Sequence, residues 1–401
     1  MNSDSTSVSP RPSPWIEHIE GNMVWSNAIL VTKGMAPYGA VALGEIDQVC
    51  EKLRLRQKEE SAWWEEWQEM ADRLKNRADS LEKAGHRLSA GNLYLRAGMY
   101  YFTAERFIYP GPEKRLMGQK AIENQTRGIV RRYPNVERVE VPFEGGTLPA
   151  LFLKSTTTHD QPVPTIVVFN GMDNCKEMSV LFSGLEFCAR GWNTLAIDGP
   201  GQGESLRLRD LFARHDYEKA GTAAFDYLLT RKEVLAEKIF VMGYSFGGYY
   251  ATRVAAFEKR YCGAIAMSAL HWDLHGWQRD ILRRQQANPK GTPQSAFHFR
   301  WIMGCIEDAE AALEKAKKFS LQSVVQQIQC PFVIVHASDD TVVPVANAHQ
   351  LYDSLTTKDK TLKILDSHEG GHYHAQADNR QVGIDFIADW IEDQLISNKK
   401  I

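Results

Sequence analysis

Six short apolar runs recur along the last two thirds of the chain, and stretches with helical periodicity separate them. Each run is four or five residues long, too short for a helix of its own and typical of a buried strand. Short buried strands that alternate with helices favour a parallel sheet with helices on both faces. We therefore predict an α/β fold with a mostly parallel, doubly wound sheet. The runs are Thr165–Phe169, Thr194–Ile197, Ile239–Met242, Ala264–Met267, Phe332–Val335 and Leu362–Leu365.

The chain before residue 136 has the periodicity of helices. Apolar residues recur there at steps of three and four, which places them on one face of a long helix. We therefore predict an N-terminal helical domain over residues 15–135. Residues 1–14 are polar and contain several Ser and Pro, so we expect a disordered tail. The apolar face consists of Trp64, Trp67, Ala71, Leu74, Ala78 and Leu81.

Residues 136–401 form the predicted α/β core, and one long segment interrupts its alternation of strands and helices. Residues 271–322 lie between two predicted strands, have a helical pattern and are rich in Trp, His and Arg. A fold of this kind accepts a cap insertion between two of its core strands. We therefore expect residues 271–322 to form a helical cap insertion.

Charge and hydropathy exclude several classes of function. The chain has 401 residues, with 47 Lys and Arg against 50 Asp and Glu. Because there is no basic surplus, a nucleic-acid partner is not expected. No apolar run approaches the roughly 18 residues of a membrane span, and the first residues lack the order of a signal peptide. We therefore expect a soluble cytoplasmic protein without a membrane partner.

The run Ile239–Met242 leads directly into Gly243-Tyr244-Ser245-Phe246-Gly247, and a helical stretch follows. A G-x-S-x-G motif between a strand and a helix is the context in which this motif marks a nucleophile. The turn is so tight that side chains at the flanking positions would clash, which explains the Gly at both. Ser245 is therefore the predicted nucleophile. The N–H of Phe246, at the start of the helix, is a predicted oxyanion donor.

A serine nucleophile needs a base, and the base needs an orienting carboxylate. In folds that carry this turn the partners follow in the order Ser, acid, His. Asp340 stands in the loop after the run Phe332–Val335 and is the predicted acid, with its neighbour Asp339 as the alternative.

Three histidines compete for the role of base after the last apolar run. His372 follows two Gly residues that permit a sharp loop, and we predict it as the base, with His368 and His374 as alternatives. Three His at this spacing could also bind a metal. The order Ser, Asp, His accounts for a His here without a metal, so we predict neither metal nor cofactor.

The loop after Thr165–Phe169 should supply the second oxyanion donor. Gly171 lets this loop approach the nucleophile, and the N–H of Met172 is the predicted donor. Asp173 follows, and it lies on the loop surface, binds a substrate hydroxyl or ketone hydrate, or acts as a proton carrier. Burial would raise its pKa and favour the protonated form. The Gly-rich block at residues 198–205 is predicted to be a structural turn.

At these motifs the sequence resembles the α/β-hydrolases. It is most similar to the group with an N-terminal helical domain that includes 2,6-dihydropseudooxynicotine hydrolase and the fungal yellowish-green pigment proteins, which shorten polyketide chains. The similarity covers residues from roughly 60 to 395. It rests on the helical stretch Leu93–Phe107, on Asn170-Gly171-Met172-Asp173 with Lys176-Glu177, on Asp198-Gly199-Pro200-Gly201-Gln202-Gly203-Glu204, and on Gly243–Gly248.

The resemblance implies hydrolysis of a carbon–carbon bond next to a ketone, in a 1,3-dicarbonyl or polyketide-like substrate. It also implies that an acidic residue after the oxyanion-loop Gly binds or activates substrate, which falls on Asp173 here. At this position the nicotine-pathway enzyme of the group has Glu, whereas this chain has Asp. Relatives often pair, so a homodimer is expected. An esterase, lactonase or acyltransferase is the alternative within the fold, and a non-catalytic binding protein is the alternative outside it.

Overall fold

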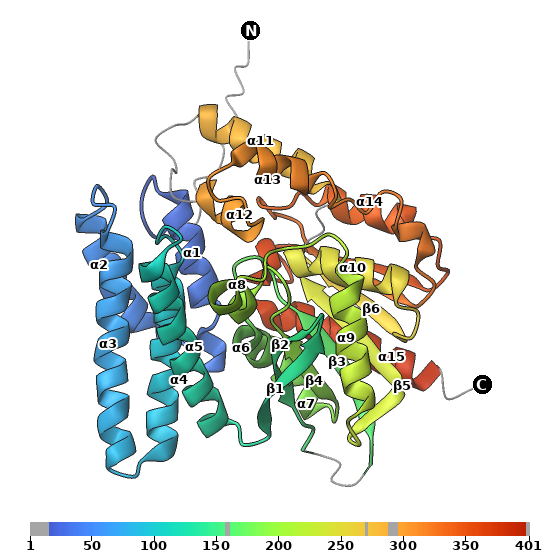
Figure 1. Ribbon diagram of the computed structural model, residues 1–401, viewed down its shortest axis with the longest axis horizontal. Helices are drawn as coiled ribbons and strands as arrows, with labels where there is room; N and C mark the ends of the chain where they lie inside the picture. Colours follow the sequence, from blue (N-terminus) through green and yellow to red (C-terminus); the bar gives the residue numbers. More distant parts are fainter. Residues whose placement is uncertain (1–15, 157–160, 269–271, 288–295, 398–401) are drawn as a thin grey trace.

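The computed structural model describes residues 16–156, 161–268, 272–287 and 296–397, so the predicted tail at residues 1–14 lies outside them (Figure 1). Helices form the first part of the described chain, on one side of the molecule in Figure 1. They are α1 (Met23–Lys33), η1 (Ala36–Tyr38), α2 (Leu43–Leu55), α3 (Ala62–Lys83), α4 (Arg87–Glu105) and α5 (Pro112–Arg132).

Helix α3 buries the face that its periodicity predicts. Trp67 is fully buried and packs against Tyr100 of α4, with ring centroids 5.5 Å apart. Trp63 is also fully buried, whereas Trp64 is only half-buried. At the start of α3 the buried aromatic residue is therefore Trp63 and not Trp64.

An eight-stranded sheet forms the core, in the order β1-β2-β4-β3-β5-β6-β7-β8. The pairs β1–β2 and β2–β4 are antiparallel, and all the others are parallel. Each of the six apolar runs lies within one of the strands β3 to β8, which confirms the α/β fold class. The strands are β1 (Val136–Phe143), β2 (Gly146–Leu153), β3 (Val163–Phe169), β4 (Asn193–Ile197), β5 (Val234–Tyr244), β6 (Gly263–Met267), β7 (Phe332–Ala337) and β8 (Lys360–Leu365).

Helices cover both faces of the sheet, so alternate strand residues are buried on opposite sides. Val167 and Val241 pack with the helices on one face, and Ile166 and Val168 pack on the other. The first face carries α9 (Glu218–Leu229) and α10 (Phe246–Phe257); the second carries α7 (Leu185–Ala189) and α15 (Arg380–Ser397). Shorter elements complete the core: α6 (Lys176–Ser179), η2 (Val180–Gly184), α8 (Gly203–Arg209), η3 (Val325–Gln327), α14 (Ala346–Ser354) and η4 (His374–Gln376).

The segment for which the sequence predicts an insertion, between β6 and β7, contains α-helices among its described residues. They are α11 (Leu274–Ala287), α12 (Ala296–Ile302) and α13 (Ala309–Ala316), and they lie together at one end of the molecule (Figure 1). Residues 271 and 288–295 of the predicted insertion lie outside the described residues. Tyr109, after α4, donates a hydrogen bond of 2.9 Å to Glu307 and packs edge-on against Phe297. The N-terminal helices therefore contact the segment between β6 and β7.

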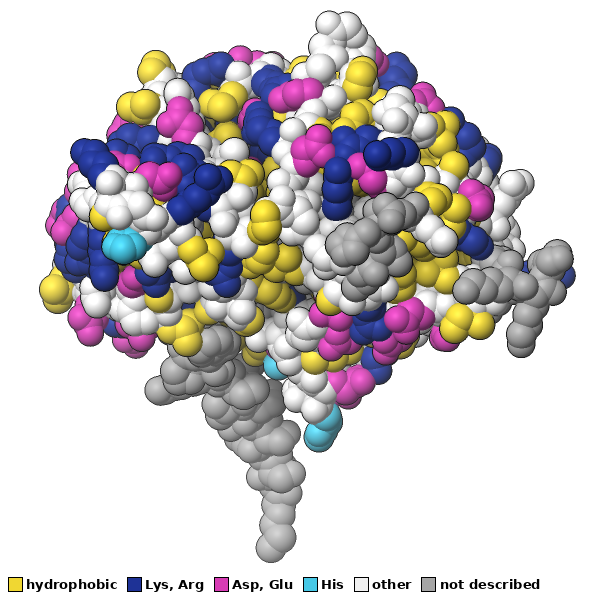
Figure 2. Space-filling model, turned by 90° about the horizontal axis from the view of Figure 1, so that it is seen from below, with side chains coloured by type: hydrophobic (Ala, Val, Ile, Leu, Met, Phe, Trp, Pro, Cys, Tyr) yellow, Lys and Arg dark blue, Asp and Glu magenta, His cyan; other side chains and the backbone are white. Residues whose placement is uncertain are grey.

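No single sign of charge dominates the face shown in Figure 2, where Lys and Arg side chains lie beside Asp and Glu.

Of the helices that the structure describes, none combines the length and apolar character needed to cross a bilayer.

Candidate active site

Ser245 occupies the turn between β5 and α10 in a strained backbone conformation, with φ 53° and ψ −129°. Non-Gly residues rarely adopt such a conformation, and it is commonly found at functional sites. A Cβ on Gly243 would overlap the carbonyl oxygen of Gly247, and a Cβ on Gly247 would overlap that of Phe169. The turn therefore requires Gly at both flanking positions, as the sequence predicts.

A chain of hydrogen bonds leads from Ser245 to a buried carboxylate. The Oγ of Ser245 lies 2.9 Å from Nε2 of His374, and Nδ1 of His374 lies 2.7 Å from Oδ2 of Asp340. The other oxygen of Asp340 accepts backbone N–H bonds from Val342 and Val343, at 2.9 and 2.8 Å. This arrangement can pass the Ser245 proton to His374 while Asp340 holds the imidazole in place.

The prediction that His372 lies beside Ser245 is corrected, because the structure brings His374 there instead. Nδ1 of His372 lies 3.1 Å from Oδ2 of Asp378 instead. The same carboxylate accepts backbone N–H bonds from Gly371, His372 and Tyr373. Asp378 thus folds residues 371–373 into a turn of their own, and the next His along the chain reaches the nucleophile.

His368 and Asp339 both lie away from the nucleophile. His368 is exposed, and its backbone N–H donates to Asp366. Asp339 is exposed as well, and Ser338 donates a hydrogen bond to its side chain. Asp340, the residue that the sequence favours, is the one beside His374.

The environment of Asp340 keeps this carboxyl ionised. Burial alone would raise the pKa of Asp340, but the interaction with His374 and the backbone bonds lower it below the usual value. His336 lies nearby, and its pKa is lowered because burial penalises the charged ring. Since Nε2 of His336 lies 3.1 Å from the carbonyl oxygen of Val343, this ring supports the loop that carries Asp340.

The predicted oxyanion loop lies directly against the nucleophile. A Cβ on Gly171 would stand 2.8 Å from the Cβ of Ser245 and 3.3 Å from its Oγ. The residue at this position therefore has to be Gly for the loop to approach so closely. Met172 and Phe246, the predicted donors, follow Gly171 and Ser245 along the chain.

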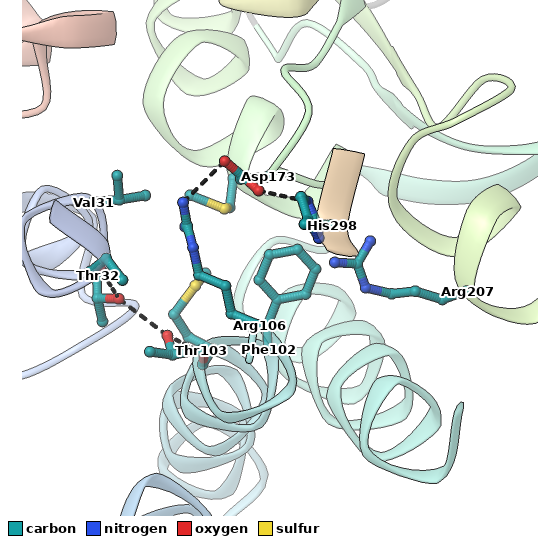
Figure 3. A pocket seen from close by; sticks show the side chains of 11 residues that line it. Val31, Thr32, Phe102, Thr103, Arg106, Asp173, Arg207 and His298 are labelled. Carbon is teal, nitrogen blue, oxygen red and sulfur yellow. Dashed lines mark hydrogen bonds and ion pairs between the residues drawn. The ribbon is translucent and has the colours of Figure 1, made fainter. Parts of the chain in front are cut away.

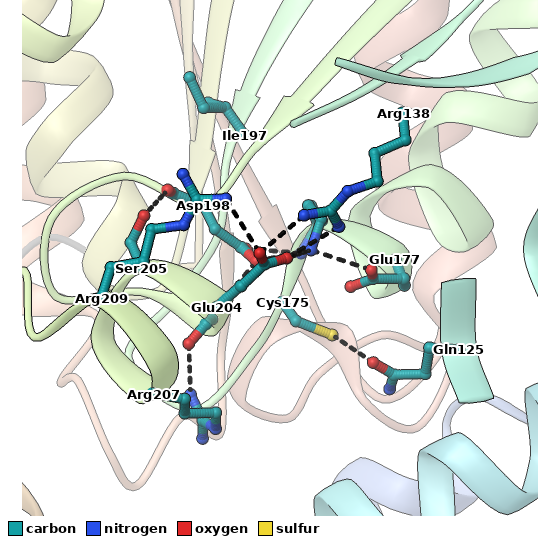
Figure 4. A network of polar contacts seen from close by, with 12 residues as sticks. Gln125, Arg138, Cys175, Glu177, Ile197, Asp198, Glu204, Ser205, Arg207 and Arg209 are labelled. Atoms are coloured by element: carbon teal, nitrogen blue, oxygen red, sulfur yellow. Dashed lines mark hydrogen bonds and ion pairs between the residues drawn. The ribbon is translucent and has the colours of Figure 1, made fainter. Parts of the chain in front are cut away.

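Asp198 directly follows β4 and lies in a network of polar contacts (Figure 4). It holds both ends of this loop. Oδ1 of Asp198 accepts from the side chain of Asn170 and from the backbone N–H of Lys176, each at 2.7 Å. The Nζ of Lys176 lies 3.2 Å from the second oxygen of Asp198 and 3.0 Å from Glu204 and from Glu177. Burial raises the pKa of Glu177. The Gly-rich pattern of residues 198–205 predicts only a turn, so this buried network is not expected from the sequence.

Asp173 lies between two partners from distant parts of the chain (Figure 3). Its Oδ2 accepts a hydrogen bond of 2.9 Å from Arg106, next to the end of α4, and its Oδ1 lies 2.7 Å from Nε2 of His298 on α12. Burial would raise the pKa of Asp173, but Arg106 and then His298 outweigh it and hold the pKa well below its usual value. The expectation of a protonated Asp173 is therefore wrong, because its neighbours favour the carboxylate.

A small cavity lies beside this trio, between α1, α4, α8 and α12. Its volume is about 20 Å³, which holds about one water-sized group. Asp173, Arg106, Arg207 and His298 provide its charged and ionisable lining, and Figure 3 shows them around one space. The remaining lining is formed by Ala28, Val31, Thr32, Met99, Phe102, Thr103 and Met178. Arg106, Arg207 and His298 carry no motif, so no sequence pattern singles them out.

The sheet topology and the nucleophile turn together define this protein as an α/β-hydrolase. The sequence profile of the prolyl oligopeptidase family matches residues 187–398, which is more than half of the chain and includes Ser245, Asp340 and His374. The chain belongs to the prolyl oligopeptidase family.

Similar proteins cover nearly the whole chain. Hydrolase LUC6 of a Fusarium species is 26% identical over 379 residues, 86% of this chain and 90% of its own length. The 2,6-dihydropseudooxynicotine hydrolase of Paenarthrobacter nicotinovorans is 26% identical over 344 residues, 85% of this chain and 87% of its own. The 20-hydroxy-prefusarin hydrolase FUS2 of Gibberella moniliformis is 24% identical over 379 residues, 86% of this chain and 90% of its own.

The fold is shared with a solved structure over the same extent. The crystal structure of 2,6-dihydroxy-pseudo-oxynicotine hydrolase superimposes with a TM-score of 0.75 at 24% identity and covers 92% of this chain and 97% of its own. The resemblance to this hydrolase group is thereby confirmed, and the chain is an α/β-hydrolase of the serine-hydrolase type.

Proposed function

We propose that the protein is a serine hydrolase in which Ser245, His374 and Asp340 form the catalytic triad. The observation that carries the proposal is the chain of two hydrogen bonds, 2.9 Å from Ser245 to His374 and 2.7 Å from His374 to Asp340. His374 takes the proton as Ser245 attacks a carbonyl carbon, and Asp340 stabilises the imidazolium that forms. The backbone N–H groups of Phe246 and Met172 stabilise the oxyanion.

The substrate that we propose carries a ketone, as in a 1,3-dicarbonyl or polyketide-like compound, and the bond that breaks is the C–C bond next to it. Attack of Ser245 gives an acyl-enzyme, and the electron pair of the broken bond leaves as an enolate that takes up the proton from His374. Water then releases the acid. Two relatives support this class by their names, which specify 2,6-dihydropseudooxynicotine and 20-hydroxy-prefusarin as substrates.

Asp173 is proposed to orient the substrate from the oxyanion loop. Because the carboxyl is ionised and bridges Arg106 and His298, its role is to hold these two side chains beside the reacting ketone. It is not the acid that protonates the leaving carbon.

We also propose that the protein is a homodimer and that it acts in catabolism or secondary metabolism. Light scattering tests whether it is a dimer.

The triad is tested with a fluorophosphonate probe and with a panel of β-diketones and activated esters. Native protein should be labelled on Ser245 and should release a carboxylic acid and a ketone from at least one diketone. Ser245→Ala should lose both the label and the activity. If esters are turned over and no diketone is, the protein is an esterase, lactonase or acyltransferase. If Ser245 is not labelled and neither esters nor diketones are turned over, the protein is a binding protein.

Asp173→Asn separates the C–C hydrolase from the esterase within the same panel. The change removes the charge that holds Arg106 and His298, so the turnover number for the diketone should fall about tenfold or more while that for an activated ester stays within twofold. Equal losses on both substrates would mean that Asp173 only supports the loop.

A further inference from the structure

The cavity beside Asp173 has more positive than negative side chains. Arg106 and Arg207 line it, and Lys114 lies behind them with its Nζ 2.9 Å from Glu105. Arg207 also pairs with Glu105, at 3.0 Å. Three cations therefore face two carboxylates, those of Glu105 and Asp173, and the surplus is one positive charge before any proton on His298 is counted.

The pKa values of the buried groups agree with a positive local field. The pKa of Lys114 is lowered to about 8, first by burial and also by the charge of Arg207. The pKa of Asp173 is shifted in the direction that favours its negative charge, although burial opposes this. A positive potential acts in the same way on any anion that enters the cavity.

Arg106 has unused capacity for hydrogen bonds. The guanidinium offers five N–H donors in a planar fork, and within the described part of the chain its one hydrogen-bonded partner is Asp173. Its side chain is 18% exposed, at the cavity wall. Both ring nitrogens of His298 are buried without a hydrogen bond of good geometry to a described residue. The walls beyond these groups are largely apolar, and Phe102, Met99 and Met178 are among them.

We infer that this cavity is a subsite for a single anionic oxygen of the substrate, held by Arg106, on a molecule that is otherwise apolar. The inference rests on the proposed function, since the cavity borders the loop that lies against Ser245. The volume suits one oxygen atom rather than a chain. A carboxylate, a phenolate and the enolate of a 1,3-dicarbonyl share this chemistry, and Arg recognises each through charge-assisted hydrogen bonds.

Binding is tested without turnover, in the Ser245→Ala protein, by calorimetry. One pair of ligands is mono-para-nitrophenyl suberate and its methyl ester, which differ in one charge; a second pair is an aryl β-diketone with a free phenol and its methyl ether. We expect the anionic member of at least one pair to bind about tenfold more tightly. The pair that shows the preference identifies the source of the oxygen.

Two substitutions in opposite directions separate charge from structure. Arg106→Gln should abolish the preference. Asp173→Asn should strengthen anion binding, because it raises the positive surplus and frees N–H donors of Arg106, although the freed side chain no longer orients the ketone for turnover. Arg73→Gln, an exposed Arg on α3, is the matched control and should leave the preference unchanged. If Arg106→Gln does not fold, Arg106→Lys keeps the charge without the fork and should give an intermediate preference.

The inference is overturned if neither pair shows a preference, or if Arg106→Gln or Arg106→Lys retains the full preference. Kinetics on the native protein distinguish that failure from failure of the proposed function. An active enzyme with equal KM for the charged and neutral esters contradicts only the subsite. An anion preference in a protein that hydrolyses nothing contradicts only the triad.

Discussion

At the scale of single residues, His372 and His374 show that a shift of two positions along the chain changes which side chains a histidine contacts. They are two residues apart, yet His374 contacts Ser245 and Asp340 while His372 lies beside Asp378. Asp378 determines which of the two lies beside Ser245. Its carboxylate accepts hydrogen bonds from three successive backbone N–H groups and so turns the chain before His374.

His374→Ala should lower kcat by about 10⁴-fold or more, similar to Ser245→Ala, because members of a triad act as a unit. His372→Ala should keep kcat within about tenfold of native, since the ring contacts Asp378 and Tyr373 and not Ser245. Steady-state kinetics on an activated ester measure both. A His372 variant as inactive as the His374 variant would contradict the assignment of the base.

Gly243→Ala should destabilise the protein by about 3 kcal/mol or more, because the new Cβ overlaps the carbonyl oxygen of Gly247 and the strained turn cannot yield. The matched control is Gly44→Ala in α2, where the space around the Cβ is open; an added methyl there should stabilise the helix by up to about 1 kcal/mol. Thermal unfolding of the two variants should shift in opposite directions.

At the scale of elements, the oxyanion loop depends on one carboxylate outside it. Asp198 accepts from Asn170 at the start of the loop and from the N–H of Lys176 at its end. Glu204 binds the same Lys176 Nζ but neither of those two donors. The two carboxylates therefore share a network and differ in their link to the loop.

Asp198→Asn should lower kcat about tenfold to a hundredfold with little change in KM, because small displacements of oxyanion donors are costly in the transition state. Glu204→Gln should reduce stability to a comparable degree and leave kcat near the native value. Steady-state kinetics with thermal melts compare them. If kcat falls equally in both, Asp198 contributes to stability alone and not to the placement of the loop.

The strands and the nucleophile turn could be predicted from sequence because their causes are local. An apolar run such as Phe332–Val335 has to be buried wherever it lies, and the Gly residues beside Ser245 report a steric need of the turn itself. His374 could not be chosen over His372, since the choice depends on a turn made by a later Asp. Arg106 reaches Asp173 from 67 residues before it, and His298 reaches it from the segment between β6 and β7. No local sequence pattern predicts contacts between residues that lie so far apart in the chain.

Across the whole molecule, the N-terminal helices and the sheet share one apolar cluster. Tyr101 and Met117, from α4 and α5, belong to the same buried cluster as Leu151 and Leu153 of β2 and Ala196 of β4. The helical part is thus packed against the core as part of its interior.

Deleting residues 1–135 should give an insoluble or inactive protein, because the apolar surface of β2 and of the segment after β3 would be uncovered. Deleting residues 1–14 should leave activity and thermal stability unchanged, since a polar, Pro-containing segment buries little. Soluble expression and ester hydrolysis of the two truncated chains check this. A soluble and fully active fragment 136–401 would show that the helices are dispensable.

The shared cluster also bears on how the chain is made. Helices α1 to α5 precede β2 and β4 in the chain, so they are synthesised before these partners. At about 5–20 residues per second, synthesis of the stretch from the end of α5 to Ala196 takes several seconds. During that time the apolar surface of the finished helices has no sheet to cover it, so we expect chaperones to bind the nascent chain at this stage of its synthesis.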